Sequence, residues 1–286
     1  MARLVDAGIG VASEPCAMAT SSTRVTDGTA ALNGDLWGSH AQDWAEVQET
    51  VQSPMYSAVF DRLGLSPGSR LLDVGCGAGR ACRVAADRGW TVSGIDAAAA
   101  LIEIARSQTP EADFQTGEIE DLPYPDDSFD AATGFNSFQY AARPSRALAE
   151  ARRVAKPGAP VIILVWGRPE HCEAAAYIAA LGRNLPAPPP GAPGPFALSN
   201  EDALRALAVQ SGLTPVEVID VPGNWEYPDL DTALRGLLAA GVAERAIRHS
   251  GEAAVRTSVI DALAPFRLAS GGYRLENEFR YLLASA

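Results

Sequence analysis

The stretch LLDVGCGAGR, residues 71–80, places three glycines at alternate positions directly behind a short apolar run. A strand that ends in a glycine turn and continues into a helix is the first unit of a doubly wound sheet. Glycines at such a turn let a ligand lie against the backbone, and the helix N-terminus offers free N–H groups to an anionic group. The stretch therefore predicts a ligand site at the carboxyl end of the first strand.

Short apolar runs alternate with longer helical segments along the chain. We expect strands at residues 70–74, 91–95, 113–115, 129–134 and 160–165, and helices at 80–88, 97–108 and 143–155. Two further strands are expected at residues 214–221 and 274–283, the second at the edge of the sheet. This order predicts an α/β fold with a Rossmann-like, doubly wound and mainly parallel seven-stranded sheet.

The N-terminal part differs in composition from the rest. Residues 1–33 are rich in Ala, Ser, Thr and Gly and show no sustained period, which predicts a flexible tail before a single domain over residues 34–286. Asp6 interrupts the only weakly apolar run, so a signal peptide is not expected. Apolar residues recur at helical steps over residues 36–63, which predicts helices that are broken at Pro54.

The regular alternation ends after Trp166. Six prolines within residues 185–195 predict loop or polyproline II structure that crosses the top of the sheet. A helix over 199–211, capped by Ser199, comes next. Residues 222–272 form a helix-rich insertion, whose apolar face either packs on the sheet or roofs a hydrophobic pocket. We expect residues 167–198 and this insertion to form a substrate lid.

Charge and cysteine content exclude several classes of function. The net charge of −12 disfavours nucleic acid and anionic membrane surfaces as partners. No apolar run reaches the roughly 18 residues of a membrane-spanning helix. The four cysteines have neither CxxC nor metal-ligand spacing, so we expect reduced thiols in a cytoplasmic protein without a metal. The oligomeric state stays open.

The spacing of the glycines separates two classes of ligand. A dinucleotide fingerprint, G-x-G-x-x-G, needs a glycine where this chain has Arg80. Here Asp73 stands two residues before the first glycine, where it suits a cationic ammonium and repels a pyrophosphate. Asp96 ends the second predicted strand, where an acid accepts both ribose hydroxyls of a nucleoside. NAD and adenosyl ligands both use such an acid, so Asp96 predicts a nucleoside ligand but does not distinguish between the two. The alternative for the glycine loop is a purely structural turn.

Four motifs in order resemble those of one family. LLDVGCGAG, SGIDAAAALIEIAR, GEIEDLPYPDDSFD and RRVAKPGAPVIILV are similar to the successive motifs of class I S-adenosylmethionine-dependent methyltransferases. The branch that they resemble includes quinone-biosynthesis and natural-product methyltransferases. The similarity covers residues 37–166, and it implies S-adenosyl-L-methionine as the cofactor.

The resemblance also implies which residues hold the cofactor. Asp73 and the loop from Gly75 to Gly79 would bind the methionine portion, Asp96 the ribose, and Glu118 the adenine amino group. Glu118 stands where the family more often has aspartate. The positions carried over are Trp37, Trp44, Asp73, Gly75, Cys76, Gly77, Gly79, Asp96, Ala97, Glu118, Ile119, Phe135 and Asn136. The alternative for Trp37 and Trp44 is that both are core anchors of an amphipathic helix.

Methyl transfer needs alignment and a dry site more than it needs a protein nucleophile, because positioning alone supplies about 7–11 kcal/mol in favourable cases. Many relatives have two histidines after the fourth strand, where this chain has Gln139 and Tyr140. The candidates for a base or an orienting group are Tyr140 and His171, the latter because histidine titrates near neutral pH. A packed aromatic and a surface histidine are their alternatives.

These observations predict transfer of a methyl group from S-adenosylmethionine to an O, N or C atom of a small molecule, in bacterial specialised or quinone metabolism. Two other functions stay open. One is a methyltransferase fold that binds the cofactor without transferring methyl, as a regulator, partner subunit or non-methylating catalyst. The other is an NAD-dependent oxidoreductase, which Arg80 disfavours.

Overall fold

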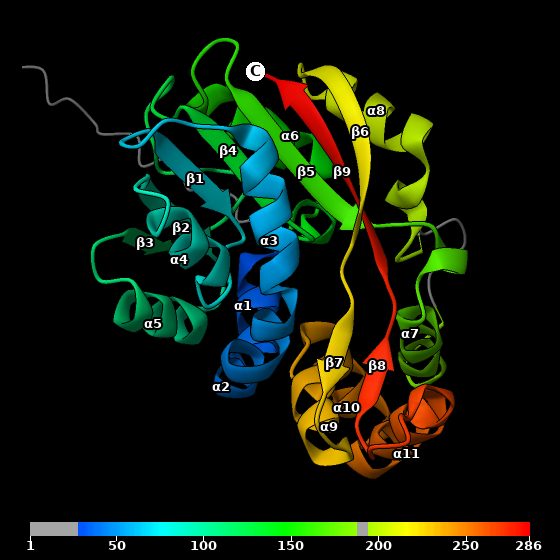
Figure 1. Cartoon of the computed structure of the whole chain (residues 1–286). Helices are drawn as coiled ribbons and strands as arrows, with labels where there is room; N and C mark the ends of the chain where they lie inside the picture. Colours follow the sequence, from blue (N-terminus) through cyan, green and yellow to red (C-terminus); the bar gives the residue numbers. More distant parts are fainter. Residues whose placement is uncertain (1–27, 188–193) are drawn as a thin grey trace, which may run out of the picture.

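A computed structural model describes residues 28–187 and 194–286. Its main sheet has seven strands in the order β3-β2-β1-β4-β5-β9-β6 (Figure 1). The strands are β1 (Arg70–Val74), β2 (Thr91–Asp96), β3 (Asp113–Thr116), β4 (Ala131–Phe135), β5 (Pro160–Trp166), β6 (Thr214–Pro222) and β9 (Glu278–Ser285). The first five run parallel, and β9 runs antiparallel to both β5 and β6. The predicted Rossmann-like fold is confirmed, and the strand order reverses beside β1, which creates the switch point where such sheets bind ligands.

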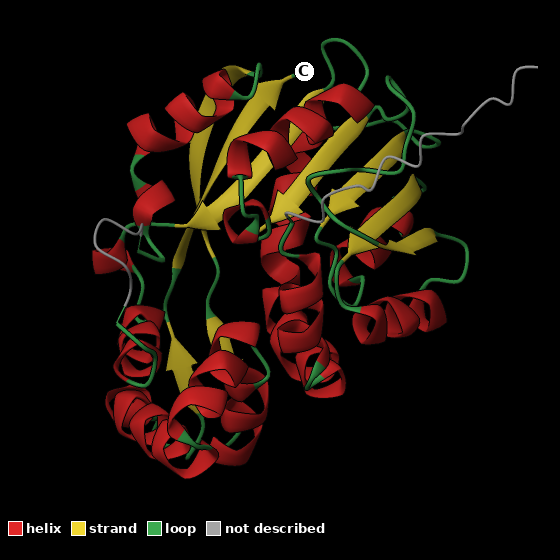
Figure 2. Cartoon of the chain, turned by 180° about the vertical axis from the view of Figure 1, so that it is seen from behind, coloured by secondary structure: helices red, strands yellow, loops and turns green. Residues whose placement is uncertain are grey.

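Helices cover both faces of the sheet because the strands are apolar on both faces (Figures 1 and 2). Leu71 packs with α3 (Glu49–Leu63), α4 (Arg80–Ala86) and α5 (Ala99–Gln108) in one buried cluster. Its neighbour Leu72 packs on the opposite face with α6 (Pro144–Val154) and α8 (Glu201–Gln210). The alternation of side chains along β1 therefore divides the core into two layers.

The insertion forms a second, smaller lobe. Strands β7 (Trp225–Tyr227) and β8 (Tyr273–Leu275) make a separate antiparallel pair. Helices α9 (Leu230–Leu238), α10 (Gly241–Ser250) and α11 (Glu252–Leu263) surround it, together with α7 (Ala174–Arg183). In Figure 1 this lobe lies beyond the carboxyl end of β5, below the sheet. The lobe is thus placed to close the ligand-binding edge of the sheet.

The N-terminal helices differ from the prediction in two ways. Helix α1 (Ala30–Gly38) begins before the expected end of the tail at residue 33. Residues 1–27, the rest of that expected tail, lie outside the described residues. Pro54 does not interrupt the helix, because it lies inside α3. The break comes earlier, between α1 and the short α2 (Ala41–Asp43), and a π-helical turn (Trp44–Gln48) leads into α3. Burial of the α3 face that carries Met55, Val59 and Phe60 outweighs the cost of proline, about 3 kcal/mol.

Strand β9 was predicted at the edge of the sheet, and that prediction is wrong. It lies between β5 and β6, and the residues before it form the separate strand β8. Phe279, Tyr281 and Leu282 are at most 1% exposed, which agrees with this position between two strands. The predicted cap of α8 is also shifted by one residue, because Asn200 accepts the hydrogen bond from the Ala203 N–H at 2.9 Å.

The proline-rich segment is only partly visible in this fold. Residues 188–193 lie outside the described part of the chain, so their path over the sheet stays a prediction. Across the ranges that are described, we find no helix with both the length and the apolar character needed to span a membrane.

Candidate active site

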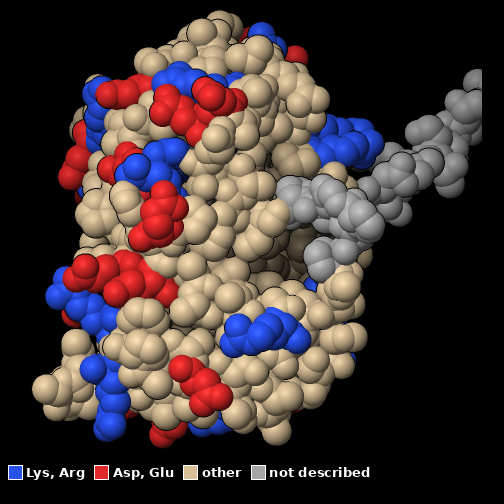
Figure 3. Space-filling model, turned by 90° about the vertical axis from the view of Figure 1, so that its right-hand side faces the viewer, with Lys and Arg blue, Asp and Glu red and all other residues tan. Residues whose placement is uncertain are grey.

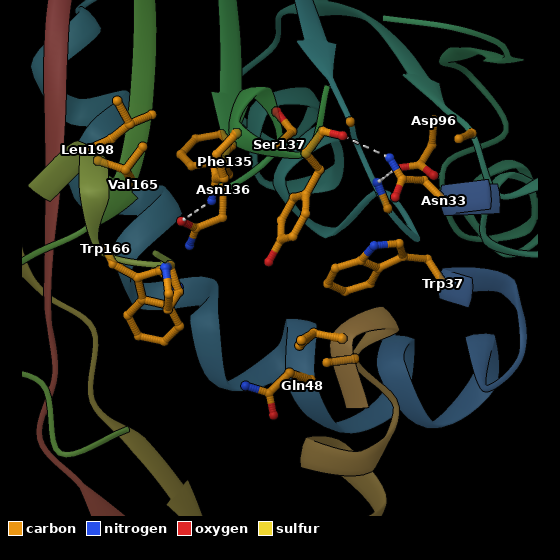
Figure 4. Close-up of a pocket in the computed structure, with 18 of the residues that line it drawn as sticks. Asn33, Trp37, Gln48, Asp96, Phe135, Asn136, Ser137, Val165, Trp166 and Leu198 are labelled. Carbon is orange, nitrogen blue, oxygen red and sulfur yellow. Dashed lines mark hydrogen bonds between the residues drawn. The ribbon is translucent and has the colours of Figure 1, made fainter. Parts of the chain in front are cut away.

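One large cavity lies at the carboxyl ends of the parallel strands, between the sheet and the insertion (Figure 4). Its volume is about 920 Å³. Asp73, Asp96, Phe135 and Trp166 bring β1, β2, β4 and β5 to its wall, while Trp225 comes from the insertion. The position is the switch point of the sheet, and the size suits two small ligands that lie side by side.

The β1–α4 turn forms part of the wall because it has no side chains to fill the space. Gly75 and Gly77 have φ values of 76° and 56°, in the region that favours glycine. The N–H groups of Gly75 and Cys76 donate to the Ile95 carbonyl at 2.7 and 3.0 Å, which ties the loop to β2. Gly75, Cys76 and Gly77 all line the cavity, and their contact with a cofactor stays a prediction.

The third glycine of the motif has a different role. Gly79 is not among the cavity-lining residues, so the structure gives it a packing role, and its predicted contact with a cofactor stays a prediction. It caps α4 with a φ of 82°, and a Cβ atom there would stand 2.9 Å from the Ala105 Cβ and 3.2 Å from the Phe114 ring. Gly79 is therefore needed for close packing of the turn against α5 and β3.

Asp96 joins the second strand to the glycine loop. Its Oδ2 accepts from the Gly77 N–H at 2.9 Å, and its Oδ1 accepts from the Ala98 N–H at 2.8 Å. Both bonds fix the carboxylate at the cavity wall beside Ala97. Because each carboxylate oxygen has a second lone pair, this group can still accept from two hydroxyls of a ligand. Burial raises the pKa of Asp96 above its ordinary value.

Asp73 lies deeper, at 2% exposure, and still reaches the cavity. The Thr133 hydroxyl donates to its Oδ1 at 2.9 Å. Burial raises the pKa of Asp73 to about 7, and the Thr133 bond opposes that rise. A carboxyl group of this kind ionises most readily when a cation binds beside it.

Glu118 lies in the cavity wall next to Ile119, after β3. Its Oε2 accepts from the Ala30 N–H at 2.9 Å, and its Oε1 accepts from the Glu120 N–H at 3.2 Å. Glu118 therefore binds the N-terminus of α1, a contact that the sequence did not suggest. The predicted bond from adenine would share this carboxylate with the helix.

Two tryptophans, one in α1 and one in the π-helical turn before α3, lie on this side of the cavity. Trp37 and Trp44 both line the cavity, with ring centroids 4.8 Å apart in an edge-to-face arrangement. Trp37 also contacts the Tyr140 ring at 5.5 Å. Both residues pack against the buried cluster around Leu101, so the core-anchor and cavity-lining interpretations hold together.

Glu49 is a site residue that the sequence reasoning missed. It is 4% exposed, and its carboxylate accepts from the Ala78 N–H (2.7 Å), the Arg80 N–H (3.2 Å) and the Trp44 indole N–H (2.8 Å). It thus binds the free N–H groups at the start of α4. A sequence signal existed, because Glu49, Gln52 and Tyr56 recur at three- and four-residue steps and all three line the cavity.

We expect Glu49 to make binding of a cationic ligand dependent on pH. Burial raises the pKa of Glu49 to about 7, so the empty protein holds its proton more tightly than the unfolded chain does. The contribution of this group to stability is therefore complete below its ordinary pKa of 4.5 and is lost as pH rises through 7. A cationic ligand favours the ionised form, so affinity for S-adenosylmethionine should rise with pH through this range.

Isothermal titration calorimetry across neutral pH measures the affinity for S-adenosylmethionine and tests this expectation. The reference ligand is S-adenosylhomocysteine, whose sulfur is uncharged. Glu49→Gln should reduce the difference in pH dependence between the two ligands, and Asp73 should account for the remainder. Glu46→Gln is a matched control, because Glu46 pairs with Arg235 at the surface. Equal pH dependence in wild type and Glu49→Gln would contradict this role.

Of the two candidate catalytic residues, Tyr140 lines the cavity and His171 does not. Tyr140 lies in the cavity wall, in a 3₁₀ turn (Phe138–Tyr140) that follows β4. Burial raises the pKa of Tyr140 to about 12, so the phenol is protonated at neutral pH and can only orient a substrate in that state. His171 lies outside the cavity, where its Nδ1 is 2.9 Å from the Glu278 Oε2. The structure therefore does not bring His171 to this cavity, because the chain after β5 places it beside Glu278 at the start of β9.

Aromatic and aliphatic side chains line the half of the cavity away from the glycine loop. Figure 4 shows Trp166 and Trp37 at opposite sides of the space, with Gln48 below and Phe135, Asn136 and Ser137 above. Phe135 and Asn136 line the cavity, as predicted. Phe135 is held by edge-to-face contacts with Tyr56 at 4.8 Å and Phe60 at 5.7 Å.

The charges of the cavity wall have one sign. The charged side chains among its described lining residues are four carboxylates, Glu49, Asp73, Asp96 and Glu118. None of the described lining residues is Lys or Arg. On the molecular face drawn in Figure 3, uncharged residues also border most of the hollow that is visible there. The cavity therefore favours neutral or cationic ligands over anionic ones.

Comparisons with known proteins agree with this geometry. Residues 72–163 match the family model described as "Methyltransferase domain". Demethylmenaquinone methyltransferase from Renibacterium salmoninarum is 35% identical over 130 residues, which cover 45% of this chain and 55% of that protein. An O-methyltransferase from Aspergillus sclerotiorum is 28% identical over 186 residues, 63% of this chain and 67% of that one. The chain thus spans only about half the length of the first of these relatives.

Solved structures share the fold at lower identity. The [4+2]-cyclase SpnF has a TM-score of 0.51 at 24% identity, with 82% of this chain and 80% of that chain covered. The YcgJ protein from Bacillus subtilis has a TM-score of 0.54 at 18% identity, with 81% and 98% covered. The resemblance seen in the motifs is confirmed by the domain match: residues 72–163 match a methyltransferase domain, and the solved structures share the fold of the chain.

Proposed function

We propose that this protein transfers a methyl group from S-adenosylmethionine to a small, uncharged and mainly apolar acceptor. One observation carries the proposal. One side of a single cavity has the glycine loop and the Asp96 carboxylate. The other side is mainly aromatic, and none of its described lining residues is cationic. The first side suits a nucleoside sulfonium, and the second suits an apolar ring.

Different side chains would bind the cofactor and exclude water in such a reaction. When bound, S-adenosylmethionine would supply the methyl carbon to an acceptor atom; the electron pair of its bond to sulfur would stay on sulfur, and the acceptor proton would pass to solvent. Asp96 would hold the ribose, Glu118 and Ile119 the adenine, and the loop at Gly75 and Gly77 the amino-acid portion. Trp37 and Trp166 would exclude water from the reacting atoms.

The carboxylates around the loop explain why a cation would be selected. Asp73 and Glu49 are both buried, and burial raises the pKa of each to about 7. Both gain most from a positive sulfonium or ammonium group nearby, because a cation stabilises their ionised form. A pyrophosphate would meet the same carboxylates unfavourably, which supports the adenosyl cofactor over NAD.

The acceptor class follows from the cavity together with the relatives. Demethylmenaquinone methyltransferases and O-methyltransferases are among the relatives. We infer a hydroxylated aromatic or quinone-type acceptor, in bacterial specialised or quinone metabolism. Buried free thiols at Cys76, Cys82 and Cys172 support a reducing, cytoplasmic setting.

Calorimetry with S-adenosylhomocysteine and a turnover assay test the two parts of this proposal. We expect saturable binding of S-adenosylhomocysteine, and release of S-adenosylhomocysteine from S-adenosylmethionine when neutral phenols or hydroquinones are added. The same assay with NADH in place of the adenosyl ligand should show no binding. Absence of S-adenosylhomocysteine binding would refute the cofactor assignment. Binding without turnover on any phenol, amine or carbon acceptor would instead favour a non-methylating role.

A further inference from the structure

Two residues that line the cavity each have a buried polar atom without a hydrogen-bond partner, and these two atoms suggest how an acceptor is recognised. We refer to the part of the cavity away from the glycine loop as the acceptor chamber, lined by Phe135, Asn136, Gln139, Trp166, Tyr177, Phe196, Leu198 and Trp225. Within the part of the chain that the structure describes, the Trp225 Nε1 and the Gln139 Oε1 are buried without a hydrogen-bond partner. Thr109 and Tyr124 also have such an atom, but neither lines the cavity.

The Trp225 indole is held in place by its surroundings. Trp225 is 4% exposed and belongs to β7, where it pairs with Leu275 of β8. Its ring meets Trp166 edge to face at 5.5 Å, and Trp166 stacks on Phe279 at 4.8 Å. The donor therefore has a defined position in an aromatic wall. A buried N–H without an acceptor is rare and costs free energy, so a ligand oxygen that accepts from it gains affinity.

Gln139 offers the opposite kind of group. Its Nε2 donates to the Asn136 Oδ1 at 3.0 Å, which fixes the orientation of the amide. The Asn136 backbone is itself fixed, since its N–H donates to the Leu164 carbonyl at 2.9 Å. The Gln139 Oε1 is left as an acceptor just after β4, next to Tyr140. It can receive a hydrogen bond from a hydroxyl or amine group of a ligand.

We propose that Trp225 and Gln139 select an uncharged aromatic acceptor that has both a carbonyl-type oxygen and a hydroxyl or N–H group. The oxygen accepts from the Trp225 indole, and the hydroxyl or N–H group donates to the Gln139 amide oxygen. Among described residues, the wall offers no cation to an acidic group, so a carboxylate in place of the hydroxyl is rejected. This inference rests on the proposed function, because it identifies the acceptor of that same site.

A matched set of two-ring probes tests each contact separately. 4-Hydroxybenzophenone carries both groups, 4-benzylphenol only the hydroxyl, and benzophenone only the carbonyl, while 4-benzoylbenzoate has a carboxylate in place of the hydroxyl. Binding to the full chain is measured by calorimetry at slightly acidic pH, with and without S-adenosylhomocysteine. We expect 4-hydroxybenzophenone to bind tightest, each single-group probe about tenfold more weakly, and the carboxylate weakest.

Two variants assign the contacts. Trp225→Phe keeps an aromatic ring but removes the N–H, so it should weaken 4-hydroxybenzophenone by about tenfold and leave 4-benzylphenol unchanged. Gln139→Met should weaken 4-hydroxybenzophenone and leave benzophenone unchanged. Trp166→Phe is the matched control, because it removes aromatic surface without a polar contact and should weaken all neutral probes alike. Thermal unfolding checks that each variant is folded.

The outcomes separate this inference from the proposed function. If Trp225→Phe weakens 4-hydroxybenzophenone and 4-benzylphenol equally, or if no neutral probe binds, the inference is overturned. The cofactor assignment depends on S-adenosylhomocysteine binding, which is measured in the same cell without any probe. Failure of the acceptor inference would therefore leave the cofactor assignment standing.

Discussion

Replacing Asp96 with alanine is expected to weaken S-adenosylhomocysteine binding about 100-fold, since about two hydrogen bonds from ribose hydroxyls to a carboxylate are lost. The structure adds a second reason. The same carboxylate accepts from the Gly77 N–H at 2.9 Å and from the Ala98 N–H at 2.8 Å. Its removal takes away the bond at Gly77, so that the glycine loop is tied to β2 only by the bonds of Gly75 and Cys76 to the Ile95 carbonyl. The affinity is measured by isothermal titration calorimetry.

Two comparisons make the Asp96 result interpretable. Asp96→Asn retains one carbonyl oxygen and should give an intermediate affinity. Asp87→Asn removes an equivalent charge from an exposed carboxylate that pairs with Arg83 at 2.9 Å, far from the cavity lining, and should leave binding unchanged. If Asp96→Ala bound S-adenosylhomocysteine as tightly as wild type, the nucleoside would have to lie elsewhere. Circular dichroism establishes that the variant retains its fold.

The sequence predicted the sheet well because the relevant information is local. Strands β1, β2, β4 and β5 are short, mainly apolar runs next to helical segments, so each can be recognised as a strand from its own residues. Strand β9 was misplaced because its position between β5 and β6 depends on pairing with β6, more than 50 residues earlier. Nothing in the alternation of β9 itself distinguishes an edge from an interior strand.

Some residues of the candidate site could likewise be identified from local sequence, and others could not. Gly75, Gly77 and Asp96 could be found from the strand ends, because the carboxyl ends of parallel strands meet at one edge. The motif cannot show that Gly79 faces α5, since that depends on how Ala105 and Phe114 pack.

Residues outside the motifs needed the tertiary structure. Glu49 comes from a helix that precedes the first strand, and only the fold brings it to the N-terminus of α4. His171 is a candidate because it follows the fifth strand and histidine titrates near neutral pH, but in the fold it pairs with Glu278 outside the cavity. A residue type suggests a chemical role, whereas the direction of the chain after β5 decides whether the side chain reaches the cavity.

Gly75→Ala is expected to lower the free energy of unfolding by about 3–5 kcal/mol and to abolish S-adenosylhomocysteine binding. Its φ of 76° is costly for alanine, and the new Cβ would stand 2.3 Å from the Ser137 Cβ. Ser137 cannot move freely, because its hydroxyl donates to the Val74 carbonyl. The added methyl group therefore displaces the β1–α4 loop, which forms part of the cavity wall.

Gly68→Ala separates the two causes of this effect. Gly68 has a φ of 84°, but a Cβ atom there would have no neighbour within 4 Å. It should cost only the backbone strain, roughly 1–2 kcal/mol, and leave cofactor binding unchanged. Urea unfolding gives the two free energies, and calorimetry gives the two affinities. Similar destabilisation by both substitutions would mean that Ser137 yields, and that backbone conformation alone, rather than close contact with β4, requires glycine at the centre of the site.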